Sequence, residues 1–264
     1  MGKIITICNQ KGGTGKTTTT INLATYLALA GKKTLLVDLD PQANATSGSG
    51  LNKHSIQKST YHILLEELEL KDILQNGSVS NLWIAPSNLD LTGAEVELVG
   101  VLGREYRLKR VLQTEKENFD FILVDSPPSL GLLTINGLCA ADSVLIPVQC
   151  EYYALEGLTQ LNNTIRLVKE NLNPSLYIEG VLLTMADYRT NLTKEVIQEA
   201  RNYFKEKVFV TVIPRNIRLT EAPSFGKPIA LYDKDSIGAQ KYEELCRELL
   251  GERVVAEPVP EGEV

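Results

Sequence analysis

Histidine, cysteine and long apolar runs are scarce in this chain of 264 residues, and each scarcity argues against a class of function. There are two histidines, which argues against a histidine-rich metal site. No apolar run approaches the about 20 residues that span a bilayer, and Met1 is not followed by the apolar stretch of a signal peptide. We therefore expect a cytoplasmic protein. The four cysteines lie far apart without a C-x-x-C pair, which predicts reduced and mostly buried thiols: Cys8, Cys139, Cys150 and Cys246.

Positive charge is also in short supply. The net charge is −6 and the sequence pI is near 5.2, which argues against a generally basic nucleic-acid binder but leaves room for a local basic patch. Lys and Arg outnumber Asp and Glu between Met185 and Lys234. With 43% hydrophobic and 23% charged residues, the composition is that of an ordinary soluble protein, long enough for one large α/β domain.

Short apolar runs alternate with amphipathic stretches along the chain. This alternation predicts a three-layer α/β/α fold with a mostly parallel, twisted sheet, as a single domain over residues 1–250. Residues 251–264 are acidic and proline-rich, which predicts a disordered tail. The predicted strands are Ile4–Cys8, Thr34–Asp38, Leu82–Ala85, Phe121–Asp125, Ser143–Val148, Tyr177–Leu183 and Val208–Ile213. The predicted helices are Thr17–Ala30, Ala94–Leu112, Ala154–Glu170, Thr193–Phe204 and Ser236–Leu250.

A glycine-rich loop joins the first predicted strand to the first predicted helix. At a helix N-terminus, unpaired N–H groups and the helix dipole favour a polyphosphate, and glycines let the backbone approach it closely. Lys16 is expected to reach the β- and γ-phosphates of a nucleotide, and the Thr17 hydroxyl to bind Mg²⁺. The ordinary P-loop has glycine where this chain has Gln10, and Lys11 adds a second cation. The loop residues are Lys11, Gly12, Gly13, Thr14, Gly15, Lys16, Thr17 and Thr18.

Two further predicted strands end in carboxylates. Asp38 and Asp40 point to the same side if their strand continues to Asp40, and Pro41 directs Asp40 towards the site. Asp125 closes the apolar run Phe121–Asp125 in the form of a Walker B aspartate, which holds Mg²⁺ directly or through water. Because ligands sit at the carboxyl ends of parallel strands, Gly12, Asp40 and Asp125 are expected to share one site.

Four stretches together resemble the ParA/Soj partition ATPases, and the resemblance runs from residue 3 to about residue 250. These ATPases belong to the deviant Walker A group, with the MinD-like cell-division ATPases and the nitrogenase iron protein. The resemblance implies an ATP- and Mg²⁺-dependent ATPase that dimerises when ATP is bound. The stretches are Asn9–Thr20, Leu35–Thr46, Asp120–Gly131 and Ile213–Asp233.

The resemblance also implies roles for single residues. Lys11 would reach across the dimer interface to the partner's ATP, whereas Lys16 would serve its own subunit's ATP. Asp40 would position or activate the attacking water, and Asp125 would hold Mg²⁺ together with Thr17. Since these motifs contain no histidine or glutamate that could act as a stronger base, we expect slow intrinsic turnover. Adenine would lie against Pro214 and Asn216, while Arg215 could be either an adenine contact or a turn residue.

ParA-like dimers bind double-stranded DNA without sequence preference, and here the resemblance points to Arg189 and Arg218. Lys227 and Lys194 are weaker candidates. Each of these cations alone could be a solvated surface charge, but a two-fold dimer would duplicate them into one larger cationic surface. The resemblance further implies a ParB/Spo0J-like partner that stimulates hydrolysis, and an association with the nucleoid.

Three other functions compete with DNA segregation. A MinD-like membrane-surface ATPase needs a C-terminal amphipathic helix, and the acidic, proline-rich tail after Gly251 predicts no stable membrane association. An iron protein needs cysteines around a shared cluster, a setting that Cys139 and Cys150 lack. A ParA-like ATPase that positions another cargo, such as a carboxysome or a chemotaxis cluster, cannot be separated from a chromosome or plasmid segregation ATPase by sequence.

Overall fold

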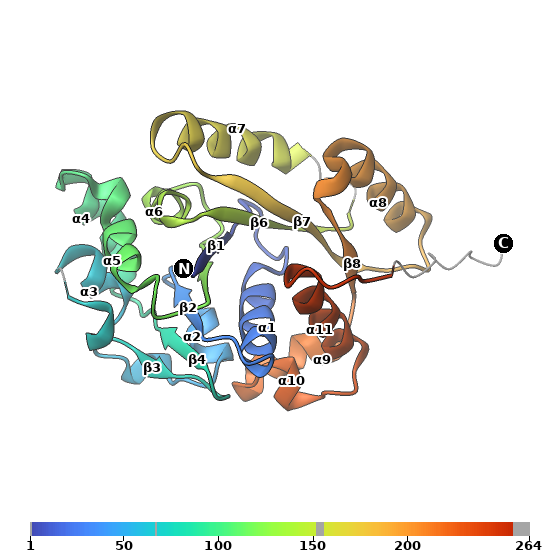
Figure 1. The fold of residues 1–264 in the computed structure, drawn as a ribbon, viewed down its shortest axis with the longest axis horizontal. Helices are drawn as coiled ribbons and strands as arrows, with labels where there is room; N and C mark the ends of the chain where they lie inside the picture. The colour runs from blue at the N-terminus through green and yellow to red at the C-terminus, as the bar shows by residue number, and fades with distance from the viewer. Residues whose placement is uncertain (1, 67, 152–155, 256–264) are drawn as a thin grey trace.

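The computed structural model describes residues 2–66, 68–151 and 156–255 (Figure 1). These residues form an eight-stranded sheet in the order β3-β4-β2-β5-β1-β6-β7-β8. The strands are β1 (Lys3–Ile7), β2 (Thr34–Asp38), β3 (Gln75–Asn76), β4 (Leu82–Ala85), β5 (Phe121–Asp125), β6 (Ser143–Gln149), β7 (Tyr177–Ala186) and β8 (Val208–Pro214).

The sheet is parallel except at one edge. Neighbouring strands pair in parallel from β4 to β8, and only β3 pairs antiparallel to its neighbour, β4. The central strands are buried over nearly their whole length, which explains why their sequences are continuous apolar runs. All seven predicted strands are confirmed. The sequence did not reveal β3, because its two residues are exposed and polar.

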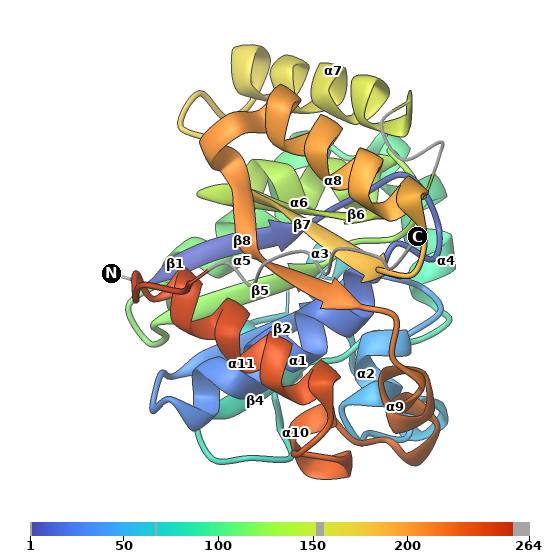
Figure 2. The ribbon, with the colours of Figure 1, turned by 90° about the vertical axis from the view of Figure 1, so that its right-hand side faces the viewer.

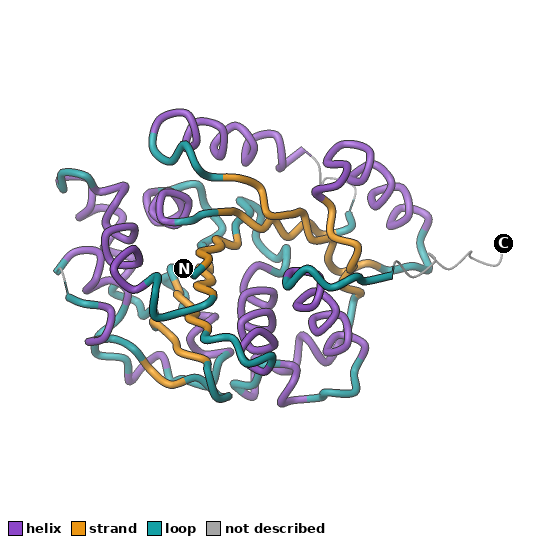
Figure 3. The backbone as a smooth tube through the Cα atoms, viewed as in Figure 1, coloured by secondary structure: helices purple, strands orange, loops and turns teal. Residues whose placement is uncertain are grey.

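Helices cover both faces of the sheet, which confirms the three-layer α/β/α prediction (Figures 1 and 3). One hydrophobic core lies under α1 and α11, and the other lies under α4 to α8. The helices are α1 (Lys16–Leu29), α2 (Asn44–Gly48), α3 (Thr60–Leu65), α4 (Leu91–Glu97), α5 (Arg107–Glu115), α6 (Leu132–Ala140), α7 (Glu156–Asn171), α8 (Asn191–Phe204), α9 (Ile217–Glu221), α10 (Ile229–Tyr232) and α11 (Ile237–Leu249).

The predicted single helix Ala94–Leu112 is wrong. The chain forms α4, a short 3-10 helix Leu98–Gly100, a break at Gly103 with a φ of 65°, and then α5. Apolar residues on both sides of the break are buried in the same core, so the helical spacing looked continuous although glycine interrupts it. The start of the predicted helix Ala154–Glu170 and most of the predicted tail lie outside the described residues.

The carboxyl ends of the parallel strands all lie along one side of the sheet, perpendicular to its edge strands, where the arrowheads of Figure 2 point. The loops that follow β1, β2, β4 and β5 all leave from this side, and with them the predicted site residues. Among the residues described, no helix combines the length and the apolar character needed to cross a membrane.

Candidate functional site

The glycine-rich loop links β1 to α1 and is fixed by its own backbone. Gly13 and Gly15 have φ angles of 74° and 87°, a conformation that strongly favours glycine, and Gly15 directly precedes the first turn of α1. Gly12 has neither a positive φ nor a neighbouring atom that a side chain would strike, so nothing among the described residues requires glycine there. The loop therefore presents the start of a fourteen-residue helix to the site.

Neighbouring strands brace the loop. The Thr184 hydroxyl on β7 donates to the carbonyl oxygen of Thr14 at 2.9 Å. The Asn9 side chain accepts from the backbone N–H of Lys11 at 3.0 Å and donates to the carbonyl oxygen of Pro147 at 2.7 Å. Pro147 and Thr184 lie far from the loop in the sequence, and no local motif indicates Thr184. Together these hydrogen bonds restrain the backbone of the loop through groups of the protein alone.

Lys16 lies inside the loop. Only 6% of the residue is exposed, and its Nζ donates to the carbonyl oxygen of Lys11 at 3.1 Å. Burial lowers the pKa of this ammonium, while the negative charges of Asp125 and Asp40 act in the opposite direction. Lys16 is thus a cation held among carboxylates, at the position where a phosphate chain on the α1 N-terminus would lie.

Thr17 and Asp125 meet as the sequence predicts. The Thr17 hydroxyl lies 2.8 Å from Oδ2 of Asp125, and the Thr20 hydroxyl donates to Oδ1 at 3.0 Å. Asp125 is fully buried at the end of β5. Burial, together with the nearby negative charges of Asp38 and Asp40, raises the pKa of its carboxyl. A nearby positive charge would stabilise the ionised form of Asp125. The Thr17 hydroxyl and the Asp125 carboxylate are oxygen ligands of the kind that a divalent cation such as Mg²⁺ binds.

Asp38 and Asp40 have different surroundings. The strand β2 ends at Asp38, so the condition for the two side chains to point together is not met. Asp38 is fully buried, and its pKa is raised to about 6, chiefly by burial. Asp40 follows in a turn, where its Oδ1 accepts from the backbone N–H of Gln42 at 2.9 Å. Asp40 retains 7% of its surface exposed, whereas Asp38 and Asp125 are fully buried.

A cavity of about 320 Å³ opens beside the first turn of α1. It contains the predicted base contacts Pro214 and Asn216, and Arg215 lines it as well. The Asn216 side-chain oxygen accepts from the N–H of Leu219 at 3.2 Å and caps α9, which leaves both N–H groups of the side-chain amide to donate to a ligand. Other lining residues come from the loop, α1, β7, β8, α9, the 3-10 helix Ala222–Phe225 and α11: Gly15, Thr18, Thr184, Met185, Ile213, Leu219, Thr220, Pro223 and Tyr242.

A larger cavity of about 410 Å³ lies elsewhere, between α3 and α5. Its lining includes Ile63, Arg107 and Arg110 but none of the predicted site residues. The smaller cavity is the better candidate for a nucleotide base, because it adjoins the phosphate-binding loop.

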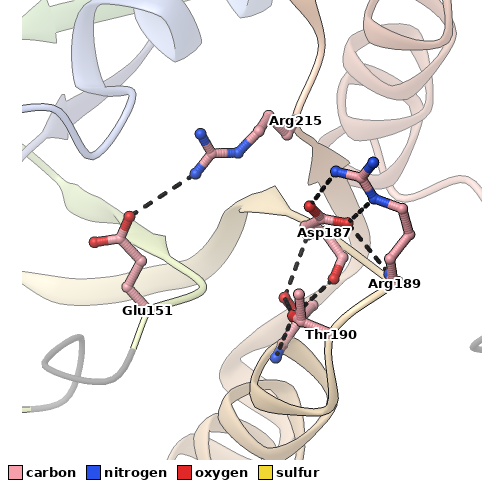
Figure 4. A network of polar contacts seen from close by, with 6 residues as sticks. Glu151, Asp187, Arg189, Thr190 and Arg215 are labelled. Atoms are coloured by element: carbon pink, nitrogen blue, oxygen red, sulfur yellow. Dashed lines mark hydrogen bonds and ion pairs between the residues drawn. The ribbon is translucent and has the colours of Figure 1, made fainter.

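Lys11 points away from this interior. Its side chain is 41% exposed, and its Nζ lies 3.5 Å from Oε2 of Glu151 at the end of β6. The other oxygen of Glu151 lies 3.9 Å from the Arg215 guanidinium (Figure 4). No local sequence pattern indicates Glu151, because its ion pairs join three segments that are distant along the chain. In this structure the second lysine is therefore held by an acid of its own subunit.

Of the predicted DNA-binding cations, Arg189, Arg218 and Lys227 are exposed, whereas Lys194 on α8 is half-buried. Arg189 and Arg218 are paired with acids. Arg189 donates to Asp187 through Nε at 2.8 Å and Nη2 at 2.6 Å (Figure 4). This pair lowers the pKa of Asp187 to about 2. Arg218 on α9 contacts Glu221 at 2.9 Å and Asp233 at 3.3 Å. Lys227 is exposed in the connection that precedes α10.

Comparisons with known proteins agree with this geometry. The sequence profile of the family described as "AAA domain" matches residues 2–178. The sporulation initiation inhibitor protein Soj of Bacillus subtilis (strain 168) is 59% identical over 249 residues, covering 94% of this chain and 98% of that protein. The chromosome partitioning protein ParA of Myxococcus xanthus (strain DK1622) is 55% identical over 250 residues, covering 95% and 88%.

The fold also matches a solved structure. The crystal structure of cobyrinic acid a,c-diamide synthase from Mycobacterium smegmatis with bound ATP analog and magnesium superimposes with a TM-score of 0.83. It is 36% identical and covers 95% of each chain. Sequence motifs, fold and relatives agree, and the chain belongs to the ParA/Soj family of partition ATPases.

Proposed function

We propose that this protein is an ATPase that works as an ATP-dependent dimeric switch in DNA segregation. The observation that carries the proposal is the 2.8 Å contact between Thr17 and Asp125, next to the buried Lys16 at the start of α1. Hydroxyl, carboxylate and lysine are the groups with which P-loop proteins hold Mg²⁺ and the β- and γ-phosphates. The bound ATP analog and magnesium of the Mycobacterium smegmatis structure support this assignment.

The loop would bind the phosphates of ATP or ADP, and the adjoining cavity would bind the adenine against Pro214 and Asn216. Among the described residues, no group of three or more His, Cys, Asp or Glu side chains could hold a metal by itself. A Mg²⁺ at Thr17 and Asp125 would therefore take most of its ligands from phosphate oxygens and water, which is usual for this ion.

Asp40 is the proposed positioning group or base for the attacking water. It belongs to the loop that follows β2, whose last residue, Asp38, pairs with Asp125 on β5, and it stays slightly exposed. A carboxylate is a weak base, so slow intrinsic turnover is expected until a partner improves the geometry.

Lys11 is the proposed dimerisation residue. It lies on the outer side of the loop, where its exposed ammonium could leave Glu151 for a phosphate of a second subunit's ATP. A cation supplied by a partner subunit adds to the charge that stabilises the γ-phosphate, as an arginine finger does. ATP would thereby join two subunits, and hydrolysis would release them.

The dimer would bind double-stranded DNA without sequence preference through Arg189 and Arg218, with Lys227 as a weaker contributor. A ParB/Spo0J-like protein would stimulate hydrolysis and so release the dimer from the nucleoid. The name of the relative from Myxococcus xanthus, a chromosome partitioning protein, favours a chromosomal role. A related ATPase that positions another cargo would use the same site.

The Asp40→Ala variant tests the enzymatic part. Removing the carboxylate should lower the rate of ATP hydrolysis by at least about 100-fold, since general-base groups contribute 10²–10⁴. ATP affinity should stay within about threefold, because the loop and Lys16 are intact. Steady-state turnover and equilibrium binding of a fluorescent ATP analogue measure the two quantities. Hydrolysis at the normal rate would remove Asp40 from the mechanism.

A further inference from the structure

Three fully buried side chains connect the loop of Asp40 to the rest of the sheet edge: Asp38, Thr46 and Ser87. The Thr46 hydroxyl donates to Oδ2 of Asp38 at 2.7 Å and accepts from the backbone N–H of Ser87 at 2.9 Å. The backbone N–H of Thr46 also donates to Oδ2 of Asp38, at 2.8 Å. Thr46 thus ties the end of β2 to the segment that follows β4.

The same network holds the backbone of Asp40 on both sides. Its N–H donates to Oδ1 of Asp38 at 3.0 Å, and its carbonyl oxygen accepts from the Ser87 hydroxyl at 2.8 Å. Each donor and acceptor in this chain of bonds has a partner, which is the condition under which buried polar groups stiffen a structure. The backbone of Asp40, from which its carboxylate extends, is therefore held by fully buried groups outside the phosphate loop.

We propose that Thr46 is a positioning residue for ATP hydrolysis: its hydroxyl fixes the loop that carries Asp40. The inference rests on the proposed role of Asp40 and extends it to a residue that touches neither ATP nor metal. A hydroxyl is needed because it must donate and accept at once, and valine, which has the same shape, can do neither. Displacement of a reacting group by about 1 Å can cost about 100-fold in rate.

The Thr46→Val variant should lower kcat by about 10- to 100-fold, as loss of a hydrogen bond that orients a functional group typically does. KM and the ATP dissociation constant should change less than about threefold, because the phosphate loop is braced by Asn9 and Thr184 instead. Thr46→Ser keeps the hydroxyl and should return kcat to within about threefold of the wild-type value. The split between kcat and KM, and this rescue, distinguish positioning from general loss of structure.

Thr34→Val is a matched control at the opposite end of the same strand. Thr34 is also fully buried, and its hydroxyl donates to a nearby backbone carbonyl oxygen, that of Lys32, at 3.0 Å. The Thr34→Val variant should leave kcat unchanged. Should Thr46→Val fail to fold, Ser87→Ala takes its place: it removes only the bond to the Asp40 carbonyl oxygen and should lower kcat with ATP binding retained.

The outcomes separate the inference from the proposed function. Asp40→Ala is measured in parallel, and normal hydrolysis by that variant overturns the role of Asp40 itself. If Asp40→Ala is inactive while Thr46→Val turns over normally, only the positioning role is wrong. The positioning role is also wrong if Thr46→Ser is as slow as Thr46→Val, or if ATP affinity falls as much as kcat.

Discussion

The two lysines of the phosphate loop are five positions apart and have opposite surroundings. Lys16 is buried near carboxylates and donates to the loop's own backbone. Its ammonium therefore already lies inside the loop that would surround the phosphates. Lys11 is half exposed and lies against Glu151 at 3.5 Å, on the outside of the loop. One lysine is built into the site, and the other is held beside it by a contact that can be exchanged.

The same contrast separates the nucleotide site from the candidate DNA surface. Thr17, Asp125 and Asp40 are held by short contacts inside the sheet edge. Arg189 and Arg218 are exposed and paired with acids of their own subunit. The outer cations must give up an acid before they can bind a phosphate, which lowers the free energy that each can contribute.

Charge reversal at Arg189 and Arg218 should strongly weaken DNA binding, and it is the largest effect that we expect. The double variant Arg189→Glu, Arg218→Glu removes four phosphate contacts from a dimer. Because each contact contributes about 0.9 to the slope of log K against log [salt], that slope should fall by about 3 to 4 units. Fluorescence anisotropy with a DNA duplex at several salt concentrations measures it, and ATP hydrolysis without DNA should be retained.

Arg166→Glu combined with Arg247→Glu serves as the control. Both arginines are exposed and each is paired with a glutamate four positions away on its own helix, but they lie on α7 and α11. Unchanged DNA affinity and salt slope in the Arg189, Arg218 variant would show that the DNA surface lies elsewhere.

Removal of Glu151 should have a smaller effect, of opposite sign. Glu151→Gln frees Lys11 and Arg215 from their acid, so the ATP-bound dimer should become tighter. An exposed ion pair contributes about 0.2–1 kcal/mol, and two Lys11 pairs are broken per dimer, so the dissociation constant should fall by about 2- to 25-fold. Sedimentation velocity with ATP over a range of protein concentrations gives this constant.

Glu170→Gln on α7 is the matched change, because it also removes one exposed acid from an ion pair with arginine. It should leave the dimer unchanged. A weaker dimer in Glu151→Gln would mean that Glu151 itself contacts the partner subunit. It would also mean that the ion pair with Glu151 does not keep Lys11 from binding the partner's nucleotide.

The residues of the phosphate loop and Asp125 could be predicted from the sequence because each of them belongs to a local pattern. A strand followed by glycines and Lys16, or a strand ending in Asp125, is readable from a few neighbouring residues. Glu151, Thr46, Ser87 and Thr184 could not be predicted as site residues, since their contacts join segments distant along the chain. Local apolar spacing also led to one wrong prediction, the single helix Ala94–Leu112, which is interrupted at Gly103.

The comparison of the two lysines is tested most directly by dimerisation in an Asp40→Ala background, where ATP should not be hydrolysed. With ATP, Asp40→Ala should sediment as a dimer. Adding Lys11→Ala should give a monomer that still binds ATP, whereas adding Lys16→Ala should abolish ATP binding itself. If the protein with Lys11→Ala forms the ATP-dependent dimer at the same protein concentration, Lys11 does not act on the partner's nucleotide, and the account of the loop as a dimerisation device is wrong.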